Sequence, residues 1–178
     1  MIADDPAQPL LPAPWPARIV ASLVDLLVIL VWLLLVTGFG LVLTPFVAGS
    51  SVPGLLLTDV IAFCFTVLPT GLYLTLTEVA PAAGTLGKRM RRLAVQTAPS
   101  RARVTSIAVR NAIKLVPWQL AHFAVSRFIL DDQFQVALAC YGASVMLVIT
   151  TIALAARDPE RRALHDRLAG TRVVALGP

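Results

Sequence analysis

The feature that most constrains this chain is an apolar run from Ile19 to Leu43 that contains a single charged residue, Asp25. As a helix rising 1.5 Å per residue, the run reaches about 37 Å, which is long enough to cross a bilayer with some tilt. A carboxylate inside hydrocarbon is costly unless protein or water receives it. Asp25 is therefore expected to mark a functional or assembly site, and Arg18 lies two helical turns before it.

The composition predicts an integral membrane protein. Of the 178 residues, 57% are hydrophobic and only 14% are charged, with a mean hydropathy of +0.80. Soluble domains carry about 25% charged residues. Residues 1–16 include five prolines and little hydrophobic pattern, so they are expected to form a disordered or extended tail. The folded domain is then expected to cover residues 17–178.

Three stretches are apolar enough to be predicted as membrane spans, at about 17–44, 54–78 and 133–157. The second of them contains Asp59 and Pro69, and the proline predicts a kink near its middle. A fourth candidate, at about 105–130, is less apolar because it also contains Pro117, His122 and Arg127.

The distribution of positive charge decides in favour of the fourth span. Basic residues gather before it and again after the last span, and positive charge concentrates on the cytoplasmic side of a membrane. Two crossings between the basic groups place fourteen of the fifteen Lys and Arg residues on one side, all except Arg127. We therefore expect an all-α bundle of four transmembrane helices in the cell membrane. Both termini are expected in the cytoplasm, with a central loop over 79–104 and a tail over 158–178.

Two short segments outside the spans are predicted to pair as a two-stranded cytoplasmic β ribbon. Residues 93–97 and 171–176 are rich in β-branched side chains and are bounded by Gly, Pro or polar residues. Residues 159–167 are expected to form a short helix before the second strand, with Gly170 as its natural stop.

Three interpretations of Asp25 remain open. As a structural element, it accepts hydrogen bonds from Arg18 or from Arg110 on another helix. As a transport element, burial lets it exchange a proton for a cation. As an assembly element, it pairs with a basic residue of a partner protein.

Two interpretations are open for each of the other polar residues discussed within the predicted spans. Asp59 and Arg127 either reach headgroups or form an ion pair that closes the outer face. His122 is either a satisfied interior histidine or part of a proton or ion path with Asp25 and Asp59.

Other functional classes have little support in the sequence. We expect no enzyme, because neither a nucleophile nor a substrate pocket is evident around His165 and Asp166. Two histidines far apart in the sequence predict no metal site, and no cofactor is indicated. No platform of interleaved aromatic residues suggests nucleic acid as a partner. Anionic lipid headgroups are the expected partners of the basic residues, including Lys88 and Arg89.

Several motifs together resemble the RDD family of small bacterial membrane proteins, named for one arginine and two aspartates. Arg18 and Asp25 match the first two letters, and Asp166 in the stretch His165-Asp166-Arg167 matches the third. The segment Thr85-Leu86-Gly87-Lys88-Arg89 is similar to the family's Thr-Pro-Gly-Lys-Arg motif, with leucine replacing proline. The pair Arg110-Asn111 matches an Arg-Asn pair that opens a later helix of the family.

The resemblance implies a role in transport, and some members of the family are associated with sodium/proton exchange. Four helices and no internal repeat make a lone carrier hard to defend. We therefore expect an accessory component or an oligomeric carrier for a small ligand or for cation/proton exchange. The expected site is a polar cluster near the cytoplasmic face. Its members are Arg18, Asp25, Lys88, Arg89, Arg110, Asn111, His165, Asp166 and Arg167. The alternative is a structural or scaffolding subunit of a larger membrane complex.

Overall fold

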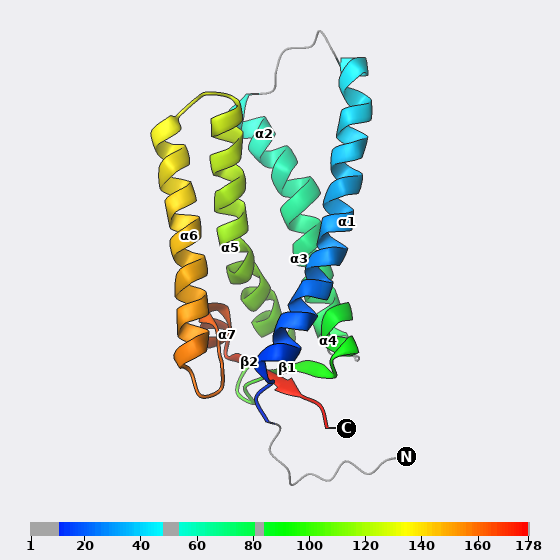
Figure 1. Ribbon diagram of the computed structural model, residues 1–178, viewed down its shortest axis with the longest axis vertical. Helices are drawn as coiled ribbons and strands as arrows, with labels where there is room; N and C mark the ends of the chain where they lie inside the picture. Colours follow the sequence, from blue (N-terminus) through cyan, green and yellow to red (C-terminus); the bar gives the residue numbers. More distant parts are fainter. Residues whose placement is uncertain (1–10, 48–53, 81–83, 178) are drawn as a thin grey trace.

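The computed structural model describes residues 11–47, 54–80 and 84–177 and is mostly helical (Figure 1). Long helices stand side by side, and a small layer of short elements covers the end of the bundle at which both chain termini lie. We call this the ribbon end. In chain order, the elements are α1 (Trp15–Val47), α2 (Leu55–Ala62), the π-helix η1 (Phe63–Val67), α3 (Leu68–Val79), α4 (Leu86–Met90), β1 (Leu93–Thr97), α5 (Arg103–Ile129), α6 (Phe134–Arg157), α7 (Leu164–Ala169) and β2 (Thr171–Ala175).

Three helical stretches of the described chain are long and apolar enough to cross a membrane: Trp15–Leu43, Leu55–Val79 and Phe134–Arg157. They coincide with the three apolar spans predicted from the sequence. Helix α5 is as long but is more polar, since it carries four Lys and Arg residues, namely Arg103, Arg110, Lys114 and Arg127.

Helix α5 runs unbroken through Pro117, beside α6 along the length of the bundle (Figure 1). The hydroxyl of Ser144 on α6 donates a hydrogen bond of 2.7 Å to the carbonyl of Pro117. Helix α1 likewise continues through Pro45, past the end predicted at about residue 44, and ends at Val47.

The kink predicted in the second span corresponds to an irregular turn. The π-helix η1 separates α2 from α3, immediately before Pro69. Since proline lacks an N–H and clashes with the preceding turn, a local change of helical geometry is expected at this place. The hydroxyls of Thr66 and Thr70 donate to the carbonyls of Ala62 and Thr66, at 2.6 and 2.7 Å, and so satisfy backbone oxygens nearby.

The predicted β ribbon is present at the ribbon end. Strands β1 and β2 are antiparallel, with Leu93 opposite Ala175 and Thr97 opposite Thr171. A ribbon of two strands is marginal without a floor. Here Leu93 and Val173 pack with alanines of the α1 region to form a small buried core.

The N-terminal tail was predicted to extend through residue 16, and this boundary is wrong. The segment 11–14 lies along β2: the N–H of Ala13 donates to Val173 O, and the N–H of Ala175 donates to Leu11 O, both at 3.1 Å. Ala13 is fully buried, and α1 already begins at Trp15. Burial and backbone pairing therefore order these residues despite their proline content. The prediction for residues 1–10 lies outside the described residues.

Two other boundaries also differ from the prediction. Helix α7 begins at Leu164, not at Pro159, because residues 159–163 form a turn in which Arg161 adopts φ +56°. The helix ends where expected, since Gly170 takes the left-handed conformation with φ +65°. Helix α5 begins at Arg103, two residues before the predicted start.

Candidate functional site

Asp25 faces the protein and not the surroundings of the bundle. The buried positions of α1 recur every fourth residue, at Ala17, Ala21, Asp25 and Ile29, so they form one stripe along the helix. The carboxylate of Asp25 accepts hydrogen bonds from the Thr85 hydroxyl (2.5 Å), the Gly87 N–H (2.9 Å) and the Tyr73 hydroxyl (3.2 Å). The requirement that protein receive this buried acid is therefore met.

These partners correct the structural interpretation of Asp25. Arg18 and Arg110 were the expected donors, but the three described donors are uncharged. Both arginines instead bind Asp166. Asp25 therefore holds the segment of Thr85 and Gly87 against α1, and it does so across about 60 residues of chain.

Gly87 is required at this contact because α4 approaches the backbone of α1 very closely. A Cβ atom at position 87 would lie 2.0 Å from the carbonyl oxygen of Ala21. The short helix α4, which the sequence analysis did not predict, starts at Leu86 and directs the Gly87 N–H at Asp25. The Thr85–Arg89 motif thus forms a turn shaped to the Ala21–Asp25 stripe.

Glu78 is the second buried acid of the site, and the sequence analysis missed it. Its side chain is fully buried at the end of α3 and accepts hydrogen bonds from Arg110 Nη1 at 2.8 and 2.7 Å. Lys88 Nζ also binds it, and Asn111 Nδ2 donates to it at 3.1 Å. Its position, at the end of an apolar span followed by a run of basic residues, was the signal available in the sequence.

Asp166 completes the charge pairing from the other side of Arg110. Its carboxylate accepts from Arg110 Nε at 2.8 Å and from the Thr171 hydroxyl at 3.0 Å, and Arg18 Nη2 lies 3.6 Å away. Burial alone raises the pKa of the Asp166 carboxyl, but the surrounding basic groups, Arg110 first among them, together hold the pKa below its usual range.

Arg110 therefore bridges Glu78 and Asp166, and the network ties α1, α3, α4, α5 and α7 together at the ribbon end. We call these residues the charged cluster: Arg18, Glu78, Lys88, Arg110, Asn111 and Asp166. The contacts of Asp166 with Arg110 and Thr171 hold the C-terminal segment against α5. Lys88 binds Glu78 and not Asp166.

Three other residues predicted for the cluster differ in their placement. His165 borders the cluster, with Nε2 3.7 Å from Asp166 Oδ2, and burial together with Arg110 lowers its pKa to about 3. Arg167 instead binds Asp158 at 3.0 Å, and its side chain is exposed. Arg89 is exposed and has no described contact with the cluster.

The opposite end of the bundle has an ion pair of its own. Arg127 Nη1 lies 3.0 and 3.2 Å from the oxygens of Asp59, and Ser126 Oγ donates to the same carboxylate at 2.7 Å. This pair joins α2 to α5, as expected from the interpretation in which Asp59 and Arg127 form an ion pair. His122 lies 3.0 Å from Thr66 Oγ1 and stacks on Trp118. Within the described chain, no hydrogen bonds connect Asp25, Asp59 and His122 into one path.

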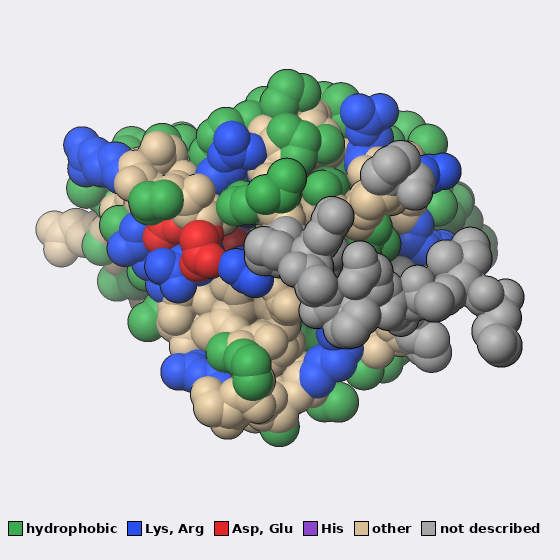
Figure 2. Space-filling model, turned by 90° about the horizontal axis from the view of Figure 1, so that it is seen from below, with side chains coloured by type: hydrophobic (Ala, Val, Ile, Leu, Met, Phe, Trp, Pro, Cys, Tyr) green, Lys and Arg blue, Asp and Glu red, His purple; other side chains and the backbone are tan. Residues whose placement is uncertain are grey.

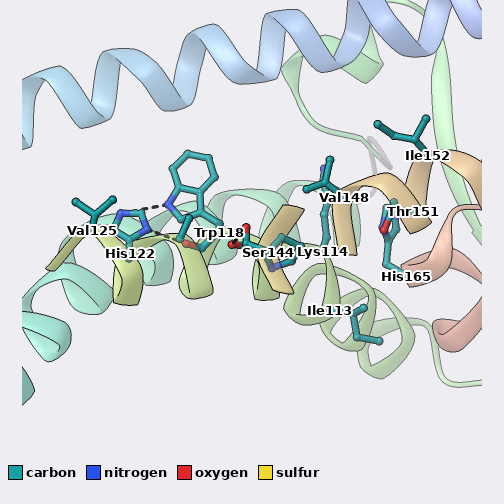
Figure 3. A pocket seen from close by; sticks show the side chains of 12 residues that line it. Ile113, Lys114, Trp118, His122, Val125, Ser144, Val148, Thr151, Ile152 and His165 are labelled. Atoms are coloured by element: carbon teal, nitrogen blue, oxygen red, sulfur yellow. Dashed lines mark hydrogen bonds between the residues drawn. The ribbon is translucent and has the colours of Figure 1, made fainter. Parts of the chain in front are cut away.

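Two cavities adjoin the charged cluster. The smaller, of about 120 Å³, is lined by Arg18, Asp25, Lys88, Arg110, Lys114 and His165, together with four less polar residues. The larger, of about 610 Å³, lies between α5 and α6 (Figure 3). His122 and Val125 lie at one end of the larger cavity and His165 lies near the other. Lys114 and His165 line both cavities, so the charged cluster and the apolar groove share a boundary.

The donors of this region do not resemble a metal centre. Across residues 11–47, 54–80 and 84–177, no three His, Cys, Asp or Glu side chains come together as metal ligands would. The chemistry that the site offers is that of charged and hydrogen-bonding groups beside an apolar space.

A family model described as the RDD family matches residues 12–170. The chain belongs to the RDD family. The match spans the two α1 residues, the Thr85–Arg89 motif, Arg110, Asn111 and Asp166, so the family motifs are the residues that build the cluster. No curated protein and no solved structure matches the chain. Family membership and the three apolar helices make this RDD protein a membrane protein.

Proposed function

We propose that this RDD protein is a transport-related protein of the cell membrane that handles a small ligand at its ribbon end. It acts as an accessory component of a transport system or as an oligomeric carrier. The observation that carries the proposal is the pair of cavities that meet at Lys114 and His165 beside the charged cluster. Ligand sites are concave, largely apolar and supplied with a few convergent polar groups, and this region has those properties.

The proposal includes four membrane crossings, with both termini and the ribbon end in the cytoplasm. Support comes from α5, whose 27 residues reach about 40 Å and are therefore long enough to cross. Its charged residues lie in protein contacts: Arg110 is 2% exposed, and Arg127 is paired with Asp59. Lys and Arg side chains surround the face of the ribbon end (Figure 2), as expected for a cytoplasmic face.

A small ligand has more support than cation/proton exchange through Asp25. The carboxylate of Asp25 already accepts three hydrogen bonds, and the carboxylates of Glu78 and Asp166 are paired with the side chain of Arg110. A carboxylate that exchanges a proton for a cation must be without other partners during part of the cycle. The carboxylates of Asp25, Glu78 and Asp166 all have partners, which favours a positioning role for them. The Asp59–Arg127 pair joins α2 and α5 at the far end, which supports a ligand site nearer the ribbon end.

We also propose that the protein is not an enzyme and that nucleic acid is not a partner. Polar side chains of the charged cluster are engaged with one another, which leaves no activated nucleophile among the described residues of the cluster. The basic ribbon end suits anionic lipid headgroups.

Isolation of the full chain in mild detergent tests the accessory and carrier versions. A stoichiometric transporter subunit or a homo-oligomer is the expected result. A stoichiometric partner with no transport activity would instead favour a scaffolding subunit. The outer half of α1, where Leu34, Leu35, Phe39 and Leu41 are exposed, is available for such a contact.

Proton flux in proteoliposomes, followed with an internal pH-sensitive dye, tests the exchange version. We expect equal flux from native protein and from the Asp25→Asn variant. A native flux that Asp25→Asn abolishes, while exposed Arg91→Gln leaves it intact, would restore exchange through Asp25.

A further inference from the structure

The groups around the smaller cavity include one more cation than carboxylates. Four basic side chains, Arg18, Lys88, Arg110 and Lys114, line the smaller cavity. Asp25 lines the same cavity, and the carboxylates of Glu78 and Asp166 pair with three of these cations. A charge set against apolar protein and membrane is costly unless a counter-charge compensates it. The arrangement therefore leaves room for one negative charge from outside the chain.

Lys114 is the cation without a partner. Arg18, Lys88 and Arg110 each have a carboxylate within 3.6 Å, whereas the ammonium group of Lys114 has no hydrogen bond or ion pair to any described residue. Lys114 lies one turn after Arg110 on α5 and borders both cavities, and its side chain retains exposed surface there. The excess charge is thus located where the polar and apolar spaces meet.

The larger cavity is mostly apolar away from this end, although His122, Ser144 and Thr151 also line it. Its walls include Pro117, Ala121, Val125, Val148 and Ile152. Figure 3 shows the side chains of Val125, Val148 and Ile152 among those that line it. Its volume of about 610 Å³ lies in the range of roughly 300–1,000 Å³ typical of small-ligand pockets. One acyl chain fits such a groove, while a complete two-chain lipid would leave its second chain outside.

We propose that the two cavities bind an anionic lipid of the surrounding membrane, with its acidic headgroup at Lys114 and one acyl chain along the α5–α6 groove. The proposal rests on the proposed function in taking these cavities as the ligand site, and it adds the class of ligand. Charge complementarity selects the headgroup, because Lys114 supplies an uncompensated cation. The apolar groove selects a lipid over a free anion, since a free anion would leave it without an occupant.

Native mass spectrometry of the full chain in a neutral detergent tests this directly. The purified protein is mixed with 1-palmitoyl-2-oleoyl phosphatidylglycerol, which is anionic, or with the matching phosphatidylcholine, which is zwitterionic. We expect at least about fivefold more bound phosphatidylglycerol than phosphatidylcholine, the factor that one basic residue near a lipid headgroup gives. Equal retention of the two lipids would overturn the proposal.

Two sets of matched variants locate the site. Lys114→Gln is expected to remove the preference for phosphatidylglycerol, whereas Lys114→Arg and the exposed Arg91→Gln are expected to keep it. Val148→Trp is expected to fill the groove and reduce lipid retention, whereas Ile149→Trp, at an exposed position of α6 outside the cavity, is expected to leave it unchanged. If Lys114→Gln or Val148→Trp retained lipid like the native protein, the proposed site would be wrong.

Thermal unfolding with inorganic phosphate distinguishes a free anion from a lipid. We expect phosphatidylglycerol to raise the Tm of native protein and phosphate to leave it unchanged. Equal stabilisation by phosphate would assign the site to a free anion and overturn the lipid proposal. This binding test is separate from the isolation experiment. Retention of lipid by a protein that forms neither a complex with a transporter subunit nor a homo-oligomer would count against the proposed function alone. Such a complex or homo-oligomer without retention of lipid would count against the lipid proposal alone.

Discussion

Both oxygens of the Glu78 carboxylate lie within hydrogen-bonding distance of Nη1 of Arg110, at 2.8 and 2.7 Å. This contact joins the end of α3 to the first half of α5, and Asp166 holds the same guanidinium through Nε. Removing one member of a buried ion pair leaves its partner uncompensated. The Glu78–Arg110 pair should therefore dominate the stability of the ribbon end.

Glu78→Gln is expected to destabilise the protein by about 3–5 kcal/mol, because Lys88 and Arg110 would remain buried without their shared carboxylate. Chemical denaturation in detergent measures the loss. Glu160→Gln is the control: Glu160 also pairs with arginines but is partly exposed, so it should change stability by no more than about 1 kcal/mol. Equal effects of the two variants would show that the Glu78 network is not a major source of stability.

Gly87→Ala is expected to disrupt the packing of α4 on α1. The added methyl group would overlap the Ala21 carbonyl, which is backbone and cannot move aside alone. We expect the free energy of unfolding to fall by about 1–3 kcal/mol or more, the range typical of overpacked cores. Gly142→Ala on α6 is the control because nothing lies within 4 Å of its added Cβ, and alanine favours a helix by about 1 kcal/mol over glycine. Comparable Tm values for the two variants would refute the close contact.

Asp25 and Thr85 are expected to be energetically coupled. Asp25→Asn and Thr85→Val each break the same 2.5 Å hydrogen bond, so the double variant should lose less stability than the sum of the single variants. We expect a coupling of about 1–2 kcal/mol in a double-mutant cycle, since the acceptor is a carboxylate. Strict additivity would mean that the Thr85 hydroxyl does not support Asp25.

His165 is expected to make stability depend on pH. Its pKa is 6.5 when unfolded and about 3 when folded, where burial and Arg110 disfavour the proton. As pH falls from 6.5 towards 3, the unfolded chain binds a proton that the folded chain does not, so the free energy of unfolding falls. At pH 5 the loss is about 2 kcal/mol, from roughly 1.4 kcal/mol for each pH unit. His165→Gln should flatten the Tm profile between pH 5 and 7, and an unchanged profile would contradict the assignment.

The four-span topology is tested by labelling single cysteines in intact cells. In a background with Cys64 and Cys140 replaced by alanine, Asp132→Cys is expected to react with a membrane-impermeant maleimide from outside. Ser100→Cys, in the turn before α5 at the ribbon end, is expected to react only after the cells are opened. Labelling of both positions from the same side would rule out a crossing by α5.

The sequence by itself determined the membrane class, the three apolar spans, the β ribbon and the family, because each depends on local composition, strand-forming segments or a motif. It also predicted that protein would receive Asp25, since hydrocarbon cannot. Only the tertiary structure decided which residues bind Asp25. Spacing suggested Arg18 as the partner of Asp25, yet the fold gives that role to Thr85 and Gly87 and directs Arg18 to Asp166.

The partners of Glu78 likewise depend on the tertiary structure. At the end of a span it resembled any residue close to the headgroups, and only the packing of α3 against α4 and α5 makes it the counter-charge of Lys88 and Arg110. Likewise, the proline-rich segment 11–14 is ordered by β2, a strand about 160 residues away. Local sequence sets which groups need a partner, while the meeting of distant segments decides which partner each group obtains.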